Sequence, residues 1–312
     1  MSSTSSSEVS VDENSSPTAS CVSSQSTSIP MTNEKYRELY VRADEHDSRF
    51  EFEQAHQVLH EARQEDASLL LCKEFVLRYV RGKVRIWDLY ANDSAEHKAL
   101  VLEARDLMEP LIQEIEELQK RGQLEAVEHA EHTDPNADET ALSWVRFTYV
   151  LGCVVMGQAI DLVGSTEQLS LAAMTHRLGK AAIRSSPGHP LPLYVMSVWT
   201  YGVSQLFWPI RKLVMSMCKG DVVLGFEKAL EWSHAAADAS VEDGDEANSE
   251  NTSVIVMNLV VRGKILYKLG RKADARELWQ QVVELDERMM RSGLDRKARD
   301  EARSMLSGGK VK

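Results

Sequence analysis

The stretch that decides the fold class is N-L-V-V-R-G-K-I-L-Y-K-L-G-R-K-A-D-A-R-E-L-W-Q-Q-V-V-E-L, residues 258–285. Apolar residues recur there at three- and four-residue spacing on both sides of Gly270, which predicts two amphipathic helices joined by a tight turn. Gly263 and Ala275 are small enough to let the two helices approach closely, and Trp279 is large enough to fill the space beside them. This alternation of small and large residues is typical of a tetratricopeptide repeat.

Weaker versions of the same pattern occur at 55–62, around Ala229 in 229–236, and at 182–187. Apolar residues at helical spacing also run through most of the remaining chain. We therefore predict an all-α fold over residues 32–308, in which antiparallel helix pairs form a tetratricopeptide-like array, or α-solenoid; a helical bundle without repeats is the alternative. Helices are expected at about 33–47, 50–64, 67–90, 94–120 (kinked or divided at Pro110), 140–163, 166–185, 191–217, 221–239, 253–269, 272–291 and 295–306.

Three segments lack this periodicity. Residues 1–31 are rich in Ser and Thr and contain no Lys or Arg, which predicts a disordered tail rather than a signal peptide. Residues 122–139 and 238–252 are acidic and rich in turn formers, so we expect surface loops there. We find no apolar stretch that we would assign to a membrane span, and we predict a soluble cytoplasmic protein without a transmembrane segment.

Charge and cysteine usage exclude several classes of protein. The chain has 312 residues and a formal net charge of −12, which argues against a general nucleic-acid binder. Its four cysteines are dispersed without a C-x-x-C pair, so neither a disulfide framework nor a thiolate zinc site is expected. This usage fits a reducing compartment.

Motifs for catalysis are also missing from the sequence. There is no phosphate-binding glycine loop, no H-E-x-x-H, no G-x-S-x-G and no dinucleotide fingerprint. His56 and His60 have a spacing that can hold a metal, but nothing nearby completes a ligand set. His129 and His132 lie in an acidic loop, which would lose considerable entropy on binding an ion. We expect no enzymatic activity, no cofactor and no metal.

Two kinds of surface remain as candidates for partner binding. Basic residues at helical spacing form stripes, which either are salt-bridged solvent faces or bind an acidic partner. An aromatic and methionine cluster either packs in the core or lines a concave apolar groove for a peptide or an acyl chain. The stripes are Arg78, Arg81 and Arg85; Arg177, Lys180 and Arg184; and Arg211 with Lys212. The cluster includes Met196, Trp199, Tyr201 and Trp208.

The segments 193–217, 226–236 and 258–285 together resemble the regulator of microtubule dynamics family. The shared features are W-x-Y on one helix, a second Trp, a basic pair, an F-E-K-A-L helix and a final tetratricopeptide-like pair. The residues in those positions are Trp199, Tyr201, Trp208, Arg211, Lys212 and Ala229.

The resemblance is most specific over 179–285. It implies a non-catalytic scaffold that associates with microtubules, with tubulin or with a microtubule-associated protein, in spindle function or chromosome segregation. The alternative to this scaffold function is a phospholipid-binding or tethering module at organelle membrane contacts. A peptide-binding adaptor of the chaperone-cofactor kind would need a two-lysine carboxylate clamp, which we do not find.

Overall fold

A computed structural model describes residues 36–124, 144–218, 222–242, 249–286, 290 and 292–309. All regular elements of these residues are helical, which confirms the predicted all-α class. The tail 1–31, the histidines at 129 and 132, and residues 125–139 and 243–248 of the two acidic loops lie outside the described residues, so their predictions stay predictions.

The described helices follow the predicted sequence of elements. Three short 3-10 helices, η2 (Ala67–Leu71), η3 (Trp87–Leu89) and η4 (Ile160–Leu162), supplement the α-helices. The α-helices are α1 (Arg37–Ser48), α2 (Phe52–Glu65), α3 (Lys73–Ile86), α4 (Ala95–Lys120), α6 (Trp144–Ala159), α7 (Ser165–Ser185), α8 (Pro190–Gln205), α9 (Trp208–Met217), α10 (Phe226–Glu242), α11 (Ser249–Lys268), α12 (Lys272–Glu284) and α13 (Gly293–Leu306).

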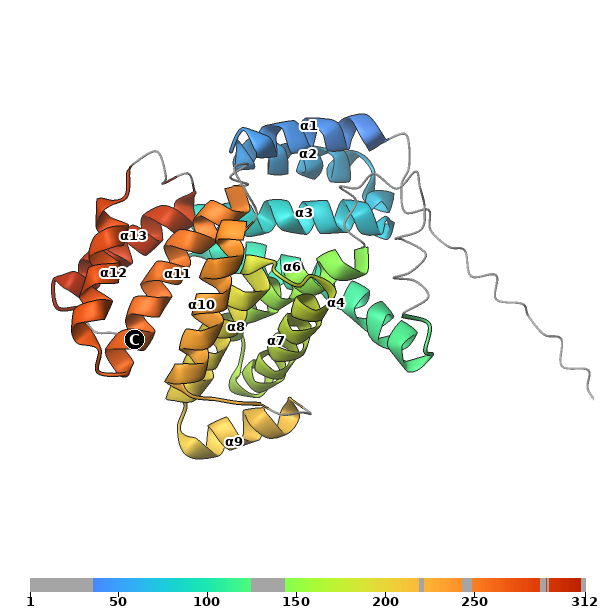
Figure 1. Cartoon of the computed structure of the whole chain (residues 1–312). Coiled ribbons are helices and arrows are strands. Elements are labelled where there is room, and N and C mark those ends of the chain that lie inside the picture. Colours follow the sequence, from blue (N-terminus) through green and yellow to red (C-terminus); the bar gives the residue numbers. More distant parts are fainter. Residues whose placement is uncertain are drawn as a thin grey trace, which may run out of the picture.

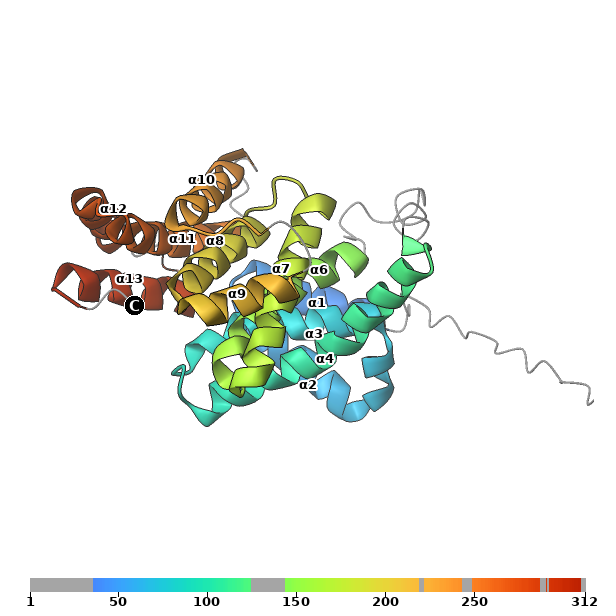
Figure 2. The same ribbon diagram turned by 90° about the horizontal axis from the view of Figure 1, so that it is seen from below.

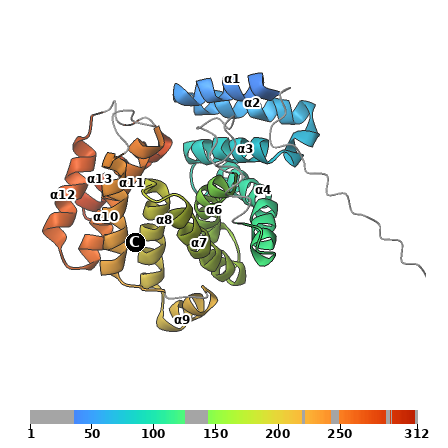
Figure 3. The same ribbon diagram turned by 45° about the vertical axis from the view of Figure 1, so that its right-hand side comes forward.

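Helices that are close in sequence lie side by side in space. Figure 3 shows α4, α6, α7, α8 and α10 following one another across the molecule, with α11 and α12 beyond α10 and with α1 and α2 above α3. The helix α9 lies apart, across the ends of α7 and α8 at the lower edge of Figure 1. Contacts also join helices that are not neighbours in sequence, such as α3 with α6 and α8 with α11, so the predicted solenoid arrangement stays a prediction.

The last helix also contacts an early part of the chain. Lys297 on α13 donates from Nζ to the Tyr90 carbonyl at 2.9 Å and to Asn92 Oδ1 at 3.0 Å. It also pairs with Asp88 on η3, at 3.3 Å. Burial raises the pKa of the Asp88 carboxyl, although the neighbouring ammonium of Lys297 opposes that shift. These contacts join the last helix to the segment between α3 and α4, which is distant in sequence.

The close approach that 258–285 predicts is present between α11 and α12. A Cβ added to Gly263 would lie 2.3 Å from Trp279 Nε1, closer than any real contact. Trp279 and Ala275 are buried, and the Trp279 indole donates to the Val260 carbonyl at 3.3 Å. The predicted packing roles of Gly263, Ala275 and Trp279 are therefore confirmed.

The remaining predicted packing residue, Ala229, is fully buried on α10. Its carbonyl accepts a hydrogen bond from Ser197 Oγ of α8 at 2.9 Å. A second close approach joins α7 to α8, where a Cβ on Gly179 would lie 2.7 Å from Met196 Sδ. Small residues thus allow close contact at more than one helix pair.

Several helices differ in extent from the prediction: 67–90 is divided into η2, α3 and η3, α10 begins at Phe226 rather than 221, and α12 ends at Glu284 rather than 291. Two further differences follow from proline and alanine positions. The expected helix 191–217 is broken after Gln205, since Pro209 has no N–H for the Gln205 carbonyl and disfavours helical backbone before it. The expected loop 238–252 is helical at both ends, because α10 continues to Glu242 while burying Ala239 in its periodic apolar face.

Proline has no such breaking effect in α4. Pro110 lies inside this helix, which runs undivided from Ala95 to Lys120. The side chain of Pro110 is exposed, so the Asp106 carbonyl that lacks its usual donor lies on the face that water can reach. The helix is therefore not divided at Pro110, and the kink that the sequence also allows stays a prediction.

Candidate functional site

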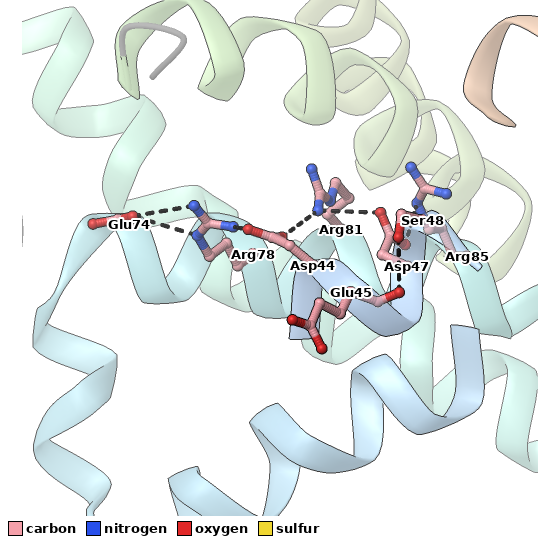
Figure 4. A network of polar contacts seen from close by, with 8 residues as sticks. All are labelled: Asp44, Glu45, Asp47, Ser48, Glu74, Arg78, Arg81 and Arg85. Carbon is pink, nitrogen blue, oxygen red and sulfur yellow. Dashed lines mark hydrogen bonds and ion pairs between the residues drawn. The ribbon is translucent and has the colours of Figure 1, made fainter. Parts of the chain in front are cut away.

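The basic stripe of α3 is bonded to α1. Arg81 pairs with Asp44 at 3.0 Å and with Asp47 at 3.2 Å, and Arg85 pairs with Asp47 at 3.2 Å. Arg78 pairs with Asp44 and, at 3.3 Å, with Glu74 one turn earlier on its own helix. Figure 4 shows these arginines and carboxylates as one network between the two helices.

This network corrects the prediction that Arg78, Arg81 and Arg85 form a partner-binding stripe. Their side chains are only 26%, 26% and 11% exposed, and each has a carboxylate partner within 4.0 Å. Apart from Glu74, the partners come from α1, and Asp44 is more than thirty residues away in sequence from Arg78 and Arg81. These arginines hold α1 against α3, so we exclude them from the candidate surface.

The basic stripe of α7 is different. Arg177, Lys180 and Arg184 are all exposed. Arg177 pairs with Glu116 of α4 at 3.0 Å, a contact that sequence spacing within α7 does not reveal. In the described part of the chain, no ion pair joins Lys180 or Arg184 to a carboxylate. These two cations are therefore available to an external partner.

The predicted apolar cluster is split between the core and the surface. Met196, Trp199 and Tyr201 are 2%, 6% and 6% exposed, so they fill the core instead of lining an open groove. The Trp199 indole donates to the Ala172 carbonyl at 2.8 Å, which fixes it between α8 and α7. The groove prediction is thus wrong for these three residues, whereas Trp208 is 60% exposed.

Trp208 belongs to a group of exposed apolar residues that sequence reasoning did not identify. They surround the break between α8 and α9, and Phe207 is 74% exposed. Lys212 lies over the indole of Trp208, with its Nζ 5.3 Å from the ring centroid. The available signal was Pro209, which breaks the helix and separates 206–213 from the core. We call this set the α9 surface: Leu206, Phe207, Trp208, Ile210, Lys212 and Leu213.

Arg211, the other member of the predicted basic pair, is half-buried beside the α9 surface. Its guanidinium donates to the Ser204 carbonyl at 3.5 Å, at the end of α8. The inner face of α9 is formed by Val214 and Cys218, which are buried in a cluster with Trp199 and Ala172. Arg211 and Lys212 therefore differ in role, and only Lys212 is fully presented to solvent.

The histidine pair of α2 belongs to a stacked aromatic cluster. His56 and His60 stack with Tyr79 of α3, and His60 Nδ1 is 2.9 Å from the Tyr79 hydroxyl. Burial lowers the pKa of His56 to about 4, and the nearby charge of Lys83 adds to this effect. No group of three or more His, Cys, Asp or Glu in the described residues could hold a metal.

Burial also lowers the pKa of His176 to about 4, with a smaller contribution from Lys180. The unfolded chain binds a proton at this residue near its ordinary pKa of 6.5, whereas the folded chain does not until about 4. Stability is therefore expected to fall as the pH decreases from 6.5 towards 4. Between pH 7 and pH 5, the free energy of unfolding of His176→Leu should fall by roughly 1–2 kcal/mol less than that of the parent. Urea unfolding at both pH values measures this difference. Equal losses in the two proteins would contradict a buried neutral histidine.

One described segment, Trp144–Leu162, is long and apolar enough to cross a membrane by composition. Within it, 56% of the tested window is buried inside the fold, and core helices of water-soluble proteins satisfy the same criterion. The finding does not distinguish a span from a core helix. The predicted lack of a transmembrane segment stays a prediction.

No protein-family model and no curated protein matches this chain. The resemblance to the regulator of microtubule dynamics family therefore depends on the quoted residues alone. The structure divides these residues by environment: Trp199, Tyr201 and Ala229 are core positions, whereas Trp208 and Lys212 belong to the α9 surface.

Proposed function

We propose that this chain is a non-catalytic helical scaffold that binds microtubules, or a microtubule-bound protein, through the exposed cations of α7. The observation that carries the proposal is that Lys180 and Arg184 project from one face of α7 without a carboxylate partner among the described residues. The family resemblance supplies the identity of the partner and extends the proposal to spindle function at the cytoskeleton.

Electrostatics explains why such a face is needed. The chain as a whole carries −12 and is repelled by the acidic tails that microtubules expose. The contact must therefore be local, and a Debye length of about 8 Å at physiological salt restricts it to charges near the interface. Arg177 contributes less than its neighbours, since Glu116 already pairs with it.

The phospholipid alternative from the sequence loses its proposed groove. It depended on an open concave surface that Met196, Trp199 and Tyr201 would line, and these side chains are buried. The scaffold proposal does not depend on them. We therefore favour binding through surface charge over enclosure of an acyl chain by these residues.

The α7 proposal is tested by charge reversal. Lys180→Glu/Arg184→Glu should fold like the parent, because both side chains are exposed, but should fail to sediment with microtubules even at low salt. The parent should sediment, and its binding should weaken steeply as salt rises. Circular dichroism checks the fold of each variant.

The matched control is Lys268→Glu/Lys272→Glu, which makes the same change in net charge at exposed positions of α11 and α12. This control should retain binding if the site is on α7. If a well-folded Lys180→Glu/Arg184→Glu variant sediments as fully as the parent, α7 does not contact the microtubule.

A further inference from the structure

Exposed apolar side chains gather on α9. Of the twelve large apolar residues that are exposed in the described structure, six lie within residues 206–215. Phe207 and Trp208 are the most exposed of these six, at 74% and 60%. Single apolar residues scattered over a surface are normal, whereas a group of them in one place indicates a surface that contacts something apolar.

The attachment of α9 makes this surface convex. Val214 and Cys218 fix the inner face of the helix to the core, whereas Phe207 and Trp208 are exposed at its N-terminal end, next to Pro209. Figures 1 and 2 show α9 at the periphery, lying across α7 and α8. The helix α9 therefore protrudes at the edge of the fold (Figure 1), and Phe207 and Trp208 are exposed on it.

The charge of this segment is opposite to that of the whole chain. Between Leu206 and Cys218 the only charged residues are Arg211 and Lys212, while the chain carries −12. The first turn of α9 contains no acidic residue, and no side chain caps its backbone N–H groups. Trp208 and Ile210 have backbone N–H groups in this turn, whereas Pro209 has none, and such groups at a helix N-terminus attract anions and add to the charge of the two basic residues.

We propose that the α9 surface docks on an anionic phospholipid membrane. Phe207 and Trp208 insert at the level of the lipid headgroups, and the ammonium of Lys212, which lies over the indole of Trp208, contacts lipid phosphates. Aromatic and aliphatic residues beside cations are the composition of helices that lie in the membrane interface. This site does not use the cations of α7 and therefore goes beyond the proposed scaffold function.

A fluid lipid surface suits this shape and charge better than a second copy of the chain does. A convex protrusion needs a complementary cavity in a protein partner, whereas lipids rearrange around it. In a two-fold dimer the same surface meets itself, so Lys212 of both copies would be brought together with no acid from 206–218 to neutralise them. Anionic headgroups supply the missing counter-charge.

Flotation with vesicles tests the proposal. The parent should float with vesicles made of equal parts phosphatidylcholine and phosphatidylserine, and much less with phosphatidylcholine alone. Phe207→Ser/Trp208→Ser should weaken binding by at least about tenfold, because both rings lose their apolar burial in lipid. The matched control Val41→Ser/Leu71→Ser removes two other exposed apolar side chains, on α1 and η2, and should bind like the parent.

Charge reversal gives a second, independent test. Lys212→Glu changes the surface by two charge units and should weaken binding to the anionic vesicles by roughly thirtyfold, at about 1 kcal/mol per charge. Lys272→Glu is the control, since Lys272 also lies over an aromatic ring, with its Nζ 5.4 Å from the centroid of Tyr267. It should leave binding unchanged, and circular dichroism confirms that each variant is folded.

Tryptophan fluorescence reports which residue enters the lipid. The other five tryptophans are buried or half-buried, so brominated phospholipids should quench the parent mainly through Trp208. Trp208→Phe should still float with anionic vesicles but lose this quenching. Equal quenching of both proteins, or unchanged flotation of Phe207→Ser/Trp208→Ser, would overturn the proposal.

Analytical ultracentrifugation without lipid distinguishes the competing occupant. A monomeric parent that floats with anionic vesicles supports membrane docking. A parent that does not float, but forms a dimer that Phe207→Ser/Trp208→Ser abolishes, would assign the α9 surface to self-association and overturn the proposal. If Phe207→Ser/Trp208→Ser loses flotation but still sediments with microtubules, the α9 surface and the α7 site act separately.

Discussion

Replacing Gly263 with alanine is expected to destabilise the protein by about 1–3 kcal/mol, although alanine normally favours a helix over glycine. The added Cβ would lie 2.3 Å from Nε1 and 2.8 Å from two ring carbons of Trp279. The indole is rigid, 1% exposed and bonded to the Val260 carbonyl, so it cannot move away without opening the contact between α11 and α12.

The matched control is Gly202→Ala on α8, where an added Cβ meets nothing within 4 Å. Helix propensity alone then applies, and this variant should be more stable than the parent by about 0.5–1 kcal/mol. Urea unfolding of both variants measures the difference. A Gly263→Ala protein at least as stable as Gly202→Ala would show that the two helices do not approach at Gly263.

The stability of Gly179→Ala should lie between that of Gly263→Ala and that of Gly202→Ala. Its added Cβ would lie 2.7 Å from the thioether of Met196, which is a flexible side chain and can shift more readily than an indole. The order of stability is therefore expected to be Gly202→Ala, Gly179→Ala and Gly263→Ala, from highest to lowest. A different order would mean that space around the glycine does not decide the effect.

Removal of the Glu103 carboxylate should destabilise the protein by roughly 2–4 kcal/mol, because it leaves a buried ammonium without its partner. Lys83 on α3 is 2% exposed and lies 2.8 Å from Glu103 Oε2 on α4. Its Nζ is also 4.6 Å from the centroid of the Tyr79 ring. Arg63 of α2 pairs with the same carboxylate, so Glu103 joins three helices.

Glu114→Ala is the control for Glu103→Ala, since Glu114 on the same helix pairs with Lys73 at a more exposed position, at 2.5 Å. We expect a loss below about 1 kcal/mol there. The double variant Lys83→Met/Glu103→Leu should recover most of the stability lost in Glu103→Ala, because it removes the buried charge together with its partner. Equal losses of unfolding free energy in Glu103→Ala and Glu114→Ala would contradict the role of Glu103.

The effect of Glu103 should also depend on pH. Burial alone raises the pKa of this carboxyl, but hydrogen bonds and charge from Lys83 and Arg63 outweigh burial and hold the pKa below its ordinary value of 4.5. The ionised form therefore stabilises the fold above about pH 4.5, and this contribution is lost as the pH falls through the lower, folded-state pKa. The difference between the parent and Glu103→Ala should shrink in acid.

Local sequence was sufficient for the helices and for their closest contact. Periodic apolar residues predicted the all-α class, and Gly263, Ala275 and Trp279 predicted which faces of α11 and α12 meet. These features depend on residues that are neighbours along one helix or across one short turn. The break at Pro209 is equally local, because this residue has no N–H to continue the helix.

Only the tertiary structure determined which basic residues are paired and which aromatic residues are exposed. Equal spacing on two helices gave Arg78, Arg81 and Arg85 partners on α1 but left Lys180 and Arg184 without one among the described residues. Trp199 and Trp208 are equally apolar, yet one is core and the other is surface.

The physical reason is that periodicity states which residues share a face, whereas exposure depends on what covers that face. The covering helix can lie far along the chain, as in the contact between Lys297 and Asp88, 209 residues apart. Helix class and local pairing were thus determined by the sequence alone. The contact of the last helix with the segment between α3 and α4, and the division of charged and apolar faces into core and surface, were determined by the packing of distant helices.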